Sequence, residues 1–146
     1  MYSHLQNIHI GSLIQQRIKE LEIDPSRICN FMKANDAEIE QMLAKKDLST
    51  DVLLQWSKLL EYDFFRLYSQ QIILFAPMKK SEFQNQEQKK SQLPQFRKNI
   101  YTREIINFIL KLIETEEKTK KQVIEEYCIP KTTLYKWISK YGKIKY

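Results

Sequence analysis

Cationic and hydroxyl side chains concentrate near the end of this 146-residue chain. The residues that could do chemistry there are Lys118, Lys120, Lys121, Lys131, Thr132, Thr133, Tyr135, Lys136 and Lys140. Ammonium groups bind phosphate oxygens, and hydroxyl groups donate to phosphates or to the edges of bases. A cluster of these types therefore predicts contact with a nucleic acid.

The spacing of the surrounding residues predicts two helices that hold these side chains. Thr119 and Gln122 have the spacing of a capping box, which opens the first helix. The segment 128–130 interrupts the helical pattern, and Pro130 suits a helix start because it supplies no N–H. The second helix has an apolar face formed by Leu134, Trp137, Ile138 and Tyr141. We expect Trp137 to lie in the core and the cationic side to be exposed.

The run Tyr127-x-Ile129-x-x-x-Thr133-Leu134-Tyr135-x-Trp137 resembles the DNA-binding segment of insertion-sequence transposase subunits of the OrfA type and of related bacterial regulators. The resemblance covers residues 101–141. It implies a helix-turn-helix whose second helix enters the major groove of double-stranded DNA. For a transposon-encoded chain, it also implies a separate catalytic transposase subunit as a partner.

Two positions depart from the pattern of that family. Glycine or asparagine often stands in the turn, where φ can be positive, and here the residue is Cys128. We therefore expect Cys128 to adopt this conformation at some cost in strain. Pro130 stands where the second helix usually starts with serine.

Composition predicts an all-α protein. The chain is 42% hydrophobic and has only two glycines and four prolines, too few turn residues for a many-turned β protein. The longest apolar run, residues 72–76, is too short to cross a bilayer, and residues 1–10 lack the pattern of a signal peptide. Cys29 and Cys128 have no Cys or His partner nearby, so we expect two reduced, buried thiols in a cytoplasmic protein.

The net charge is distributed unevenly along the chain. Residues 1–77 contain 8 Lys and Arg against 10 Asp and Glu, which gives −2, whereas residues 78–146 contain 16 against 8, which gives +8; the sum is the total of +6. This asymmetry predicts that the C-terminal half meets a polyanion. A membrane surface also attracts cations, but a helix lying on lipid needs a broad exposed apolar face. The apolar residues here are needed for the core.

The pattern predicts two small helical domains joined by a polar linker. Residues 1–76 are expected to form a five-helix module, residues 77–94 the linker, and residues 95–146 a three-helix DNA-binding domain. The expected starts of the N-terminal helices are Ile8 or Ile10, Pro25 after Asp24, Asn35 with Glu38, Ser49, and Asp63. Thr102 is expected to cap the first C-terminal helix.

The N-terminal module resembles the repressor-type (Xre-like) helix-turn-helix domain. The residues that carry this resemblance are Ile10-Gly11-x-x-Ile14, Ile28 and Phe31, Ile39, and Leu53-x-x-Trp56-x-x-Leu59-Leu60. Its third helix carries Asp36, Glu38 and Glu40, which would repel phosphates. Self-association of residues 1–76 as a homodimer, or docking of a partner, is therefore favoured over DNA reading by this module.

No group of residues predicts catalysis, a metal or a cofactor. His4 and His9 lack partners at ligand spacing, and the chain has no glycine-rich phosphate loop. Nothing alternates like the strands of a metal-dependent transposase nuclease. We expect a double-stranded DNA-binding protein that acts as a transposase-associated subunit or a transcriptional regulator. The alternative is an interaction adaptor whose basic half only tethers it to nucleic acid; RNA binding is disfavoured, because no Gly-x-x-Gly clamp is present.

Overall fold

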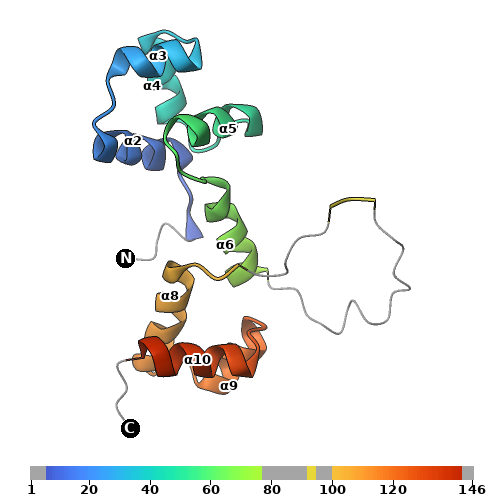
Figure 1. The fold of residues 1–146 in the computed structure, drawn as a ribbon. Helices are drawn as coiled ribbons and strands as arrows, with labels where there is room; N and C mark the ends of the chain where they lie inside the picture. Colours follow the sequence, from blue (N-terminus) through green and yellow to red (C-terminus); the bar gives the residue numbers. More distant parts are fainter. Residues whose placement is uncertain (1–5, 77–91, 95–99, 143–146) are drawn as a thin grey trace. The chain divides into compact units, whose positions relative to one another are not determined.

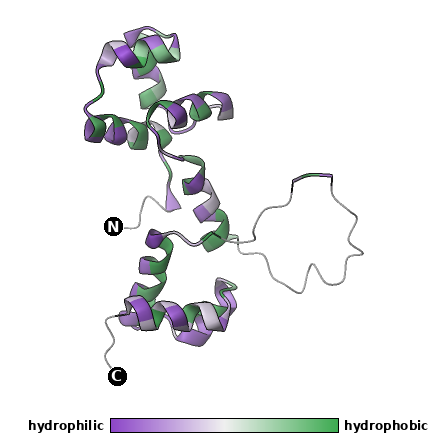
Figure 2. Ribbon diagram, in the orientation of Figure 1, coloured by the Kyte–Doolittle hydropathy of each residue, from purple (hydrophilic) through white to green (hydrophobic). Residues whose placement is uncertain are grey.

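The described residues of this computed structural model, 6–76, 92–94 and 100–142, form helices and no strand (Figure 1). The helices are α2 (Ile10–Leu21), α3 (Pro25–Met32), α4 (Asp36–Ala44), α5 (Thr50–Leu59), α6 (Phe65–Phe75), α8 (Arg103–Glu114), α9 (Lys120–Glu126) and α10 (Lys131–Tyr141). The predicted all-α class is confirmed. Figure 2 shows polar and apolar residues mixed along each helix, as expected of amphipathic helices in small domains.

The contacts along the chain divide it into two compact units, Met1–Tyr68 and Ser69–Tyr146. The division falls inside α6, before the predicted border at residue 76. The predicted linker, residues 77–94, lies outside the described residues except for 92–94. The prediction of a module, a linker and a second domain therefore stays a prediction.

The first unit buries one apolar cluster between its short helices. Its members are Ile8, Ile10, Ile14, Ile28, Met32, Ile39, Leu53, Trp56, Leu59, Leu60, Phe64 and Leu67. The start of α2 meets the end of α4, where the N–H of Gly11 donates to the carbonyl of Lys45 at 3.1 Å. A Cβ at Gly11 would overlap the carbonyl oxygen of Leu43, so only glycine allows this approach.

The predicted helix starts of the first unit are confirmed, with one correction to the capping chemistry. Asn35 and Glu38 form both bonds of a capping box, and the Ser49 hydroxyl accepts from the N–H of Val52. Asp24 precedes Pro25 as expected, but its carboxylate makes no bond to the helix backbone. It accepts from the Ser26 hydroxyl instead, because that partner lies only two residues away.

Helical spacing places Leu21 and Phe31 on the apolar faces of α2 and α3, but neither residue is in the core. Phe31 is 46% exposed and Leu21 is 41% exposed. The buried stripe of α3 runs through Ile28 and Met32, one turn apart, and leaves Phe31 at its edge. Leu21 is the last residue of α2, where the chain turns away through Glu22 in a left-handed conformation.

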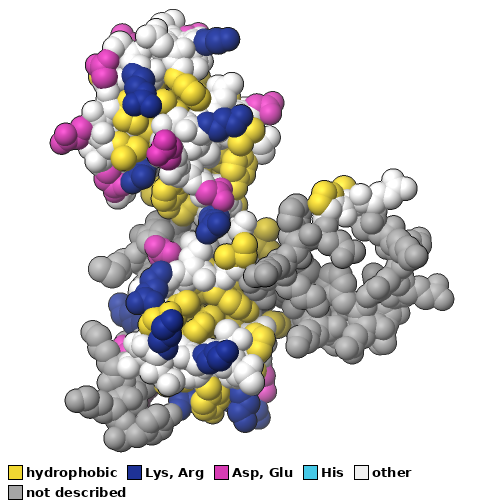
Figure 3. All heavy atoms as spheres, in the orientation of Figure 1, with side chains coloured by type: hydrophobic (Ala, Val, Ile, Leu, Met, Phe, Trp, Pro, Cys, Tyr) yellow, Lys and Arg dark blue, Asp and Glu magenta, His cyan; other side chains and the backbone are white. Residues whose placement is uncertain are grey.

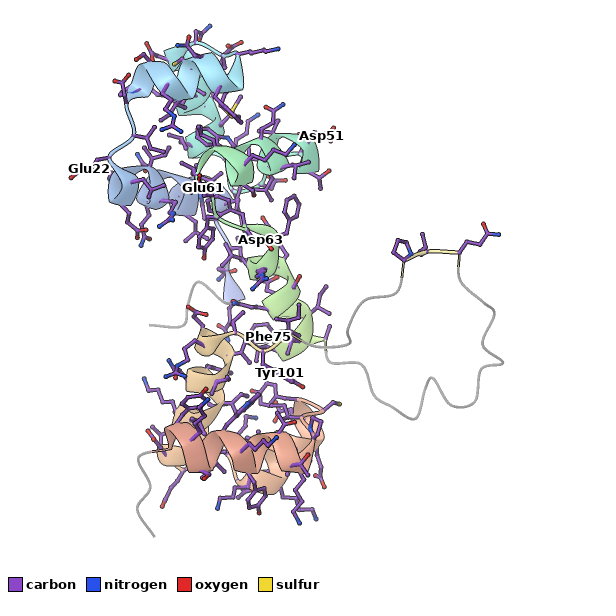
Figure 4. The ribbon with its side chains drawn as sticks, viewed as in Figure 1. Glu22, Asp51, Glu61, Asp63, Phe75 and Tyr101 are labelled. Atoms are coloured by element: carbon purple, nitrogen blue, oxygen red, sulfur yellow. The ribbon has the colours of Figure 1, made fainter. Side chains whose placement is uncertain are left out.

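Several turns of the described chain use a left-handed residue that is not glycine. These residues are Glu22, Lys33, Glu61, Glu116 and Cys128, and no described glycine has a positive φ. Figure 4 labels Glu22 and Glu61, which follow α2 and α5. For L-residues this conformation costs on the order of 1–2 kcal/mol each, so the turns store strain.

The second unit is built around α8, which buries residues on a broad face. The buried residues of α8 are Ile105, Ile106, Ile109, Leu110 and Leu112. Ile113, at helical spacing from Ile105 and Ile109, is only half-buried. Thr102 caps α8 as predicted, and its hydroxyl also accepts from Gln70 Nε2 at 2.7 Å.

Trp137 lies in the core of the second unit, as predicted. Its side chain is 7% exposed and meets the Tyr101 ring edge to face, with 4.8 Å between ring centroids. Leu134 and Ile138 are buried beside it on the same face of α10. The burial of this face determines which side of α10 remains exposed.

Candidate nucleic-acid interface

A four-residue connection, Tyr127 to Pro130, joins α9 to α10. Cys128 has φ of 51°, so the expected left-handed conformation is confirmed. Ile129 is 1% exposed and anchors the connection in the core. Pro130 occupies the N-cap position of α10 with φ of −57° and ψ of 136°. Its fixed φ therefore orients the first turn of α10.

The two helices start with different chemistry. The Thr119–Gln122 capping box of α9 is confirmed, with N–H to oxygen distances of 3.2 Å and 2.8 Å. The start of α10 has no side-chain cap and no acidic residue in its first turn. The N–H groups of that turn carry partial positive charge, to which the Lys131 ammonium adds. The start of α10 is therefore electropositive.

An exposed tyrosine connects the starts of both helices. The Tyr135 ring, on a residue that is 42% exposed, has Lys120 Nζ at 5.6 Å and Lys131 Nζ at 5.8 Å from its centroid. Both distances lie within the range of cation–π attraction. The two lysines come from different helices and approach the same ring. We call Lys120, Lys131 and Tyr135 the Tyr135 cluster.

The polar side of α10 is open. Its exposed residues are Lys131, Thr132, Tyr135, Lys136, Ser139 and Lys140, and Thr133 is half-buried. The helix carries no Asp or Glu along its length. In Figure 3 the charged side chains on the visible face of the second unit are mostly Lys and Arg, whereas both signs of charge are mixed on the first. The predicted residues that belong to α10 therefore lie on one side of the helix, and all but Thr133 are exposed.

Lys118 differs from the other predicted lysines. Its ammonium forms an ion pair with Glu126 at 2.5 Å, and the hydrogen bond to Glu126 raises the pKa of Lys118 above its ordinary value. Its backbone N–H donates to the carbonyl of Leu112 at 3.1 Å. Lys118 therefore links α9 to the end of α8 and has part of its charge neutralised. By contrast, Lys121 lies 3.9 Å from Glu125 in a highly exposed pair that holds it weakly.

Sequence reasoning missed a second cationic cluster at the other end of α10. Arg103 Cζ lies 4.0 Å from the Tyr141 ring centroid, and Lys140 Nζ lies 5.2 Å from it. A hydrogen bond from Lys140, with the nearby charge of Arg103, lowers the pKa of Tyr141. Arg103 opens α8, far away in sequence. The signal available was an arginine in a first helical turn, where the helix dipole disfavours a cation.

The first unit contains a comparable pair of helices with the opposite charge. Lys33 joins α3 to α4 with φ of 52°. The second helix of the pair, α4, exposes Asp36, Glu38 and Glu40 and contains no Lys or Arg. The half-buried Cys29 thiol donates to Asp36 at 3.3 Å, and this hydrogen bond raises the pKa of Cys29.

The expectation that both thiols are buried is wrong, because Cys29 and Cys128 are half-buried. Within the described residues, no group of His, Cys, Asp and Glu could hold a metal ion. No helix in that part of the chain has the length and apolar character needed to cross a membrane. Comparison of the chain with family models, with curated proteins and with solved structures gives no match.

Proposed function

We propose that this protein binds double-stranded DNA by placing α10 in the major groove. The observation that carries the proposal is the polar side of α10, which is exposed, carries lysines and hydroxyls, and has no carboxylate. In this arrangement Lys131, Thr132, Thr133, Tyr135 and Lys136 are nearest to bases or backbone. An α-helix with its side chains is about 10–12 Å wide, and the major groove is about 12 Å wide.

The start of α9 supports the same orientation. Lys120 and Lys121 occupy its first turn without any acidic residue, and Lys120 meets Lys131 across the Tyr135 ring. Cations at helix starts reduce helix stability, since they add to the positive end of the dipole. Their presence at both helix starts is explained when a phosphate strand lies beside them. Lys118 contributes less, because Glu126 already pairs with it.

The biological role proposed is that of a transposase-associated DNA-binding subunit or a transcriptional regulator. The run from Tyr127 to Trp137, which resembles the DNA-binding segment of OrfA-type subunits, supports this role. In the first case a separate subunit would supply catalysis. The proposal assigns no catalytic step and no cofactor to this chain.

A salt titration with a charge-matched control tests the proposal. The test variant is Lys131→Ala, Lys136→Ala, Lys140→Ala, and the control is Lys45→Ala, Lys46→Ala, Lys58→Ala; all six lysines are exposed. Both variants lose the same formal charge, from α10 in one case and from the first unit in the other. Binding of the full chain to a labelled random-sequence duplex is measured by fluorescence anisotropy over a range of salt concentrations.

The α10 variant is expected to bind on the order of a hundredfold more weakly at low salt, with a salt slope smaller by about three. The control is expected to keep the wild-type slope. An equal loss of affinity and salt slope in both variants would show that binding reflects diffuse electrostatic attraction. It would contradict a specific role for α10. Selection of bound fragments from random duplexes then gives the sequence that is read and reveals any two-fold symmetry.

The adaptor alternative is favoured by one observation in the first unit. Large apolar residues are exposed there: Leu21, Phe31, Leu54 and Tyr62. Under this alternative, residues 1–76 form a homodimer or bind a partner. Sedimentation equilibrium of the full chain and of Phe31→Ser, Leu54→Ser tests it. A dimer that dissociates in the variant supports the alternative, and a wild-type monomer at micromolar concentration removes the homodimer.

A further inference from the structure

We propose that Arg103 and Lys140, held by Tyr141, form a second phosphate-binding site at the C-terminal end of α10. This site rests on the proposed function, because it would bind the DNA backbone while the other end of α10 reads the groove. It adds α8 to the interface, and no residue of that helix belongs to the set predicted from sequence.

The geometry brings two cations from different helices onto one aromatic ring. Arg103 comes from the first turn of α8 and Lys140 from the last turn of α10. Their charged groups lie 4.0 Å and 5.2 Å from the Tyr141 ring centroid. Tyr141 is half-buried, whereas Arg103 and Lys140 are exposed. The ring therefore limits the motion of both side chains, and their charged groups stay accessible to solvent.

The positive charge of this cluster is not neutralised by a carboxylate in the described part of the chain, which favours the binding of an anion. Among the described residues, no carboxylate forms an ion pair with Arg103 or with Lys140. Two cations near one ring repel each other, and the positive end of the α8 dipole disfavours Arg103 further. Lys140 at a helix C-terminus is favourable, and the Tyr141 ring offsets part of the cost of Arg103. A bound phosphate would offset both unfavourable terms.

The spacing along α10 fits a backbone contact on duplex DNA. Lys131 and Lys140 are nine residues apart, which is about 13 Å along a helix axis. This length is comparable with the width of the major groove, about 12 Å. When the first turn of α10 reaches base edges, its last turn lies toward a strand that borders the groove. Arg103 and Lys140 are then placed to contact that strand.

The test compares three variants of the full chain in the same salt titration. Arg103→Gln removes the proposed contact, and Arg103→Lys keeps the charge. Lys111→Gln removes an exposed cation from the same helix, eight residues or about 12 Å further along. Circular dichroism melting of each variant checks folding. Arg103→Gln is expected to melt close to wild type, because the loss of the Tyr141 ring contact and the relief of the unfavourable dipole interaction act in opposite directions.

Arg103→Gln is expected to reduce the salt slope by about one and to weaken binding equally on all duplex sequences. Arg103→Lys should restore the slope, and Lys111→Gln should change it by less than half as much. A wild-type slope in Arg103→Gln, or an equal loss in Lys111→Gln, would overturn this site and leave the proposed function standing. If the wild-type chain binds no duplex DNA, the proposed function itself fails.

Discussion

The α3–α4 pair and the α9–α10 pair share one local design and carry opposite charge. Each pair has a short first helix and a left-handed connecting residue with nearly the same φ (52° at Lys33, 51° at Cys128). The second helix of each pair buries one side, through Ile39 in α4 and through Leu134, Trp137 and Ile138 in α10. The exposed side of α4 is acidic, and that of α10 is basic. The comparison teaches that this backbone design does not determine the charge of the exposed side, which the surface side chains set independently.

The two second helices also differ in how their starts are stabilised. Asn35 and Glu38 cap α4, and Asp36 adds a carboxylate to its first turn, all of which favours the helix. The start of α10 has Pro130 without a side-chain bond and then Lys131. The capped, acidic start of α4 stabilises that helix. The start of α10 leaves free N–H groups beside a cation, as expected where an anion completes the helix start.

The largest expected effect comes from removing one tryptophan from each unit. Trp56 is fully buried in the first unit and Trp137 is 7% exposed in the second. Each substitution to alanine is expected to cost about 3–5 kcal/mol. Trp137→Ala should unfold the small second unit and abolish DNA binding, whereas Trp56→Ala should retain binding. Circular dichroism and anisotropy on both variants measure this, and loss of binding in Trp56→Ala would show that the first unit contributes to the interface.

Removing the caps tests whether the two helix pairs fold separately. Asn35→Ala and Thr119→Ala each delete the side chain of a capping box, at an expected cost of about 1 kcal/mol. In a Trp137→Phe background, Trp56 fluorescence reports denaturation of the first unit; in a Trp56→Phe background, Trp137 reports the second. Each cap deletion should shift only the transition of its own unit. A shift in both transitions would mean that the units unfold together.

Glycine at the matched turn residues is expected to stabilise both pairs by a similar, smaller amount. Cys128→Gly and Lys33→Gly remove the penalty of a left-handed L-residue, partly offset by the greater freedom of glycine in the unfolded chain. The net gain expected is about 0.5–1 kcal/mol in each, measured by urea denaturation. Cys128→Ala keeps the strain and is the control. A gain at residue 33 alone would indicate that the Cys128 thiol, 3.8 Å from the Glu125 carbonyl, compensates for its strain.

The smallest expected effect concerns Lys118, the predicted DNA ligand that the protein pairs with Glu126. Because its pKa is raised in the folded state, its contribution to stability is present below its ordinary value of 10.5 and is lost as pH rises through the raised value. Lys118→Gln should therefore melt slightly below wild type at pH 7, and the difference should shrink as the pH rises through the raised pKa of Lys118. Melting curves across this range measure it, with Glu126→Gln as the matched variant. A constant difference would exclude the ion pair as the cause.

Local rules predicted most of the fold, because they depend on neighbours in sequence. The capping boxes at Asn35 and Thr119 and the strained turn at Cys128 are of this kind. The polar side of α10 followed from helical spacing in the same way. The prediction failed for Phe31, since helical spacing alone does not say how wide a buried stripe is. It also missed the approach of Arg103 to Tyr141, which depends on how α8 packs against α10.

The left-handed turn residues also bear on how such a protein can evolve. Glu22, Lys33, Glu61, Glu116 and Cys128 hold conformations that glycine would adopt more easily, while the chain's two glycines serve elsewhere. A mutation to glycine at any of these bends would raise the margin above the folding threshold. Under the proposed function, that margin would let a lineage accept destabilising substitutions along α10 and acquire a new target sequence. The stability available at these turns would thereby limit how readily the sequence preference of α10 can change.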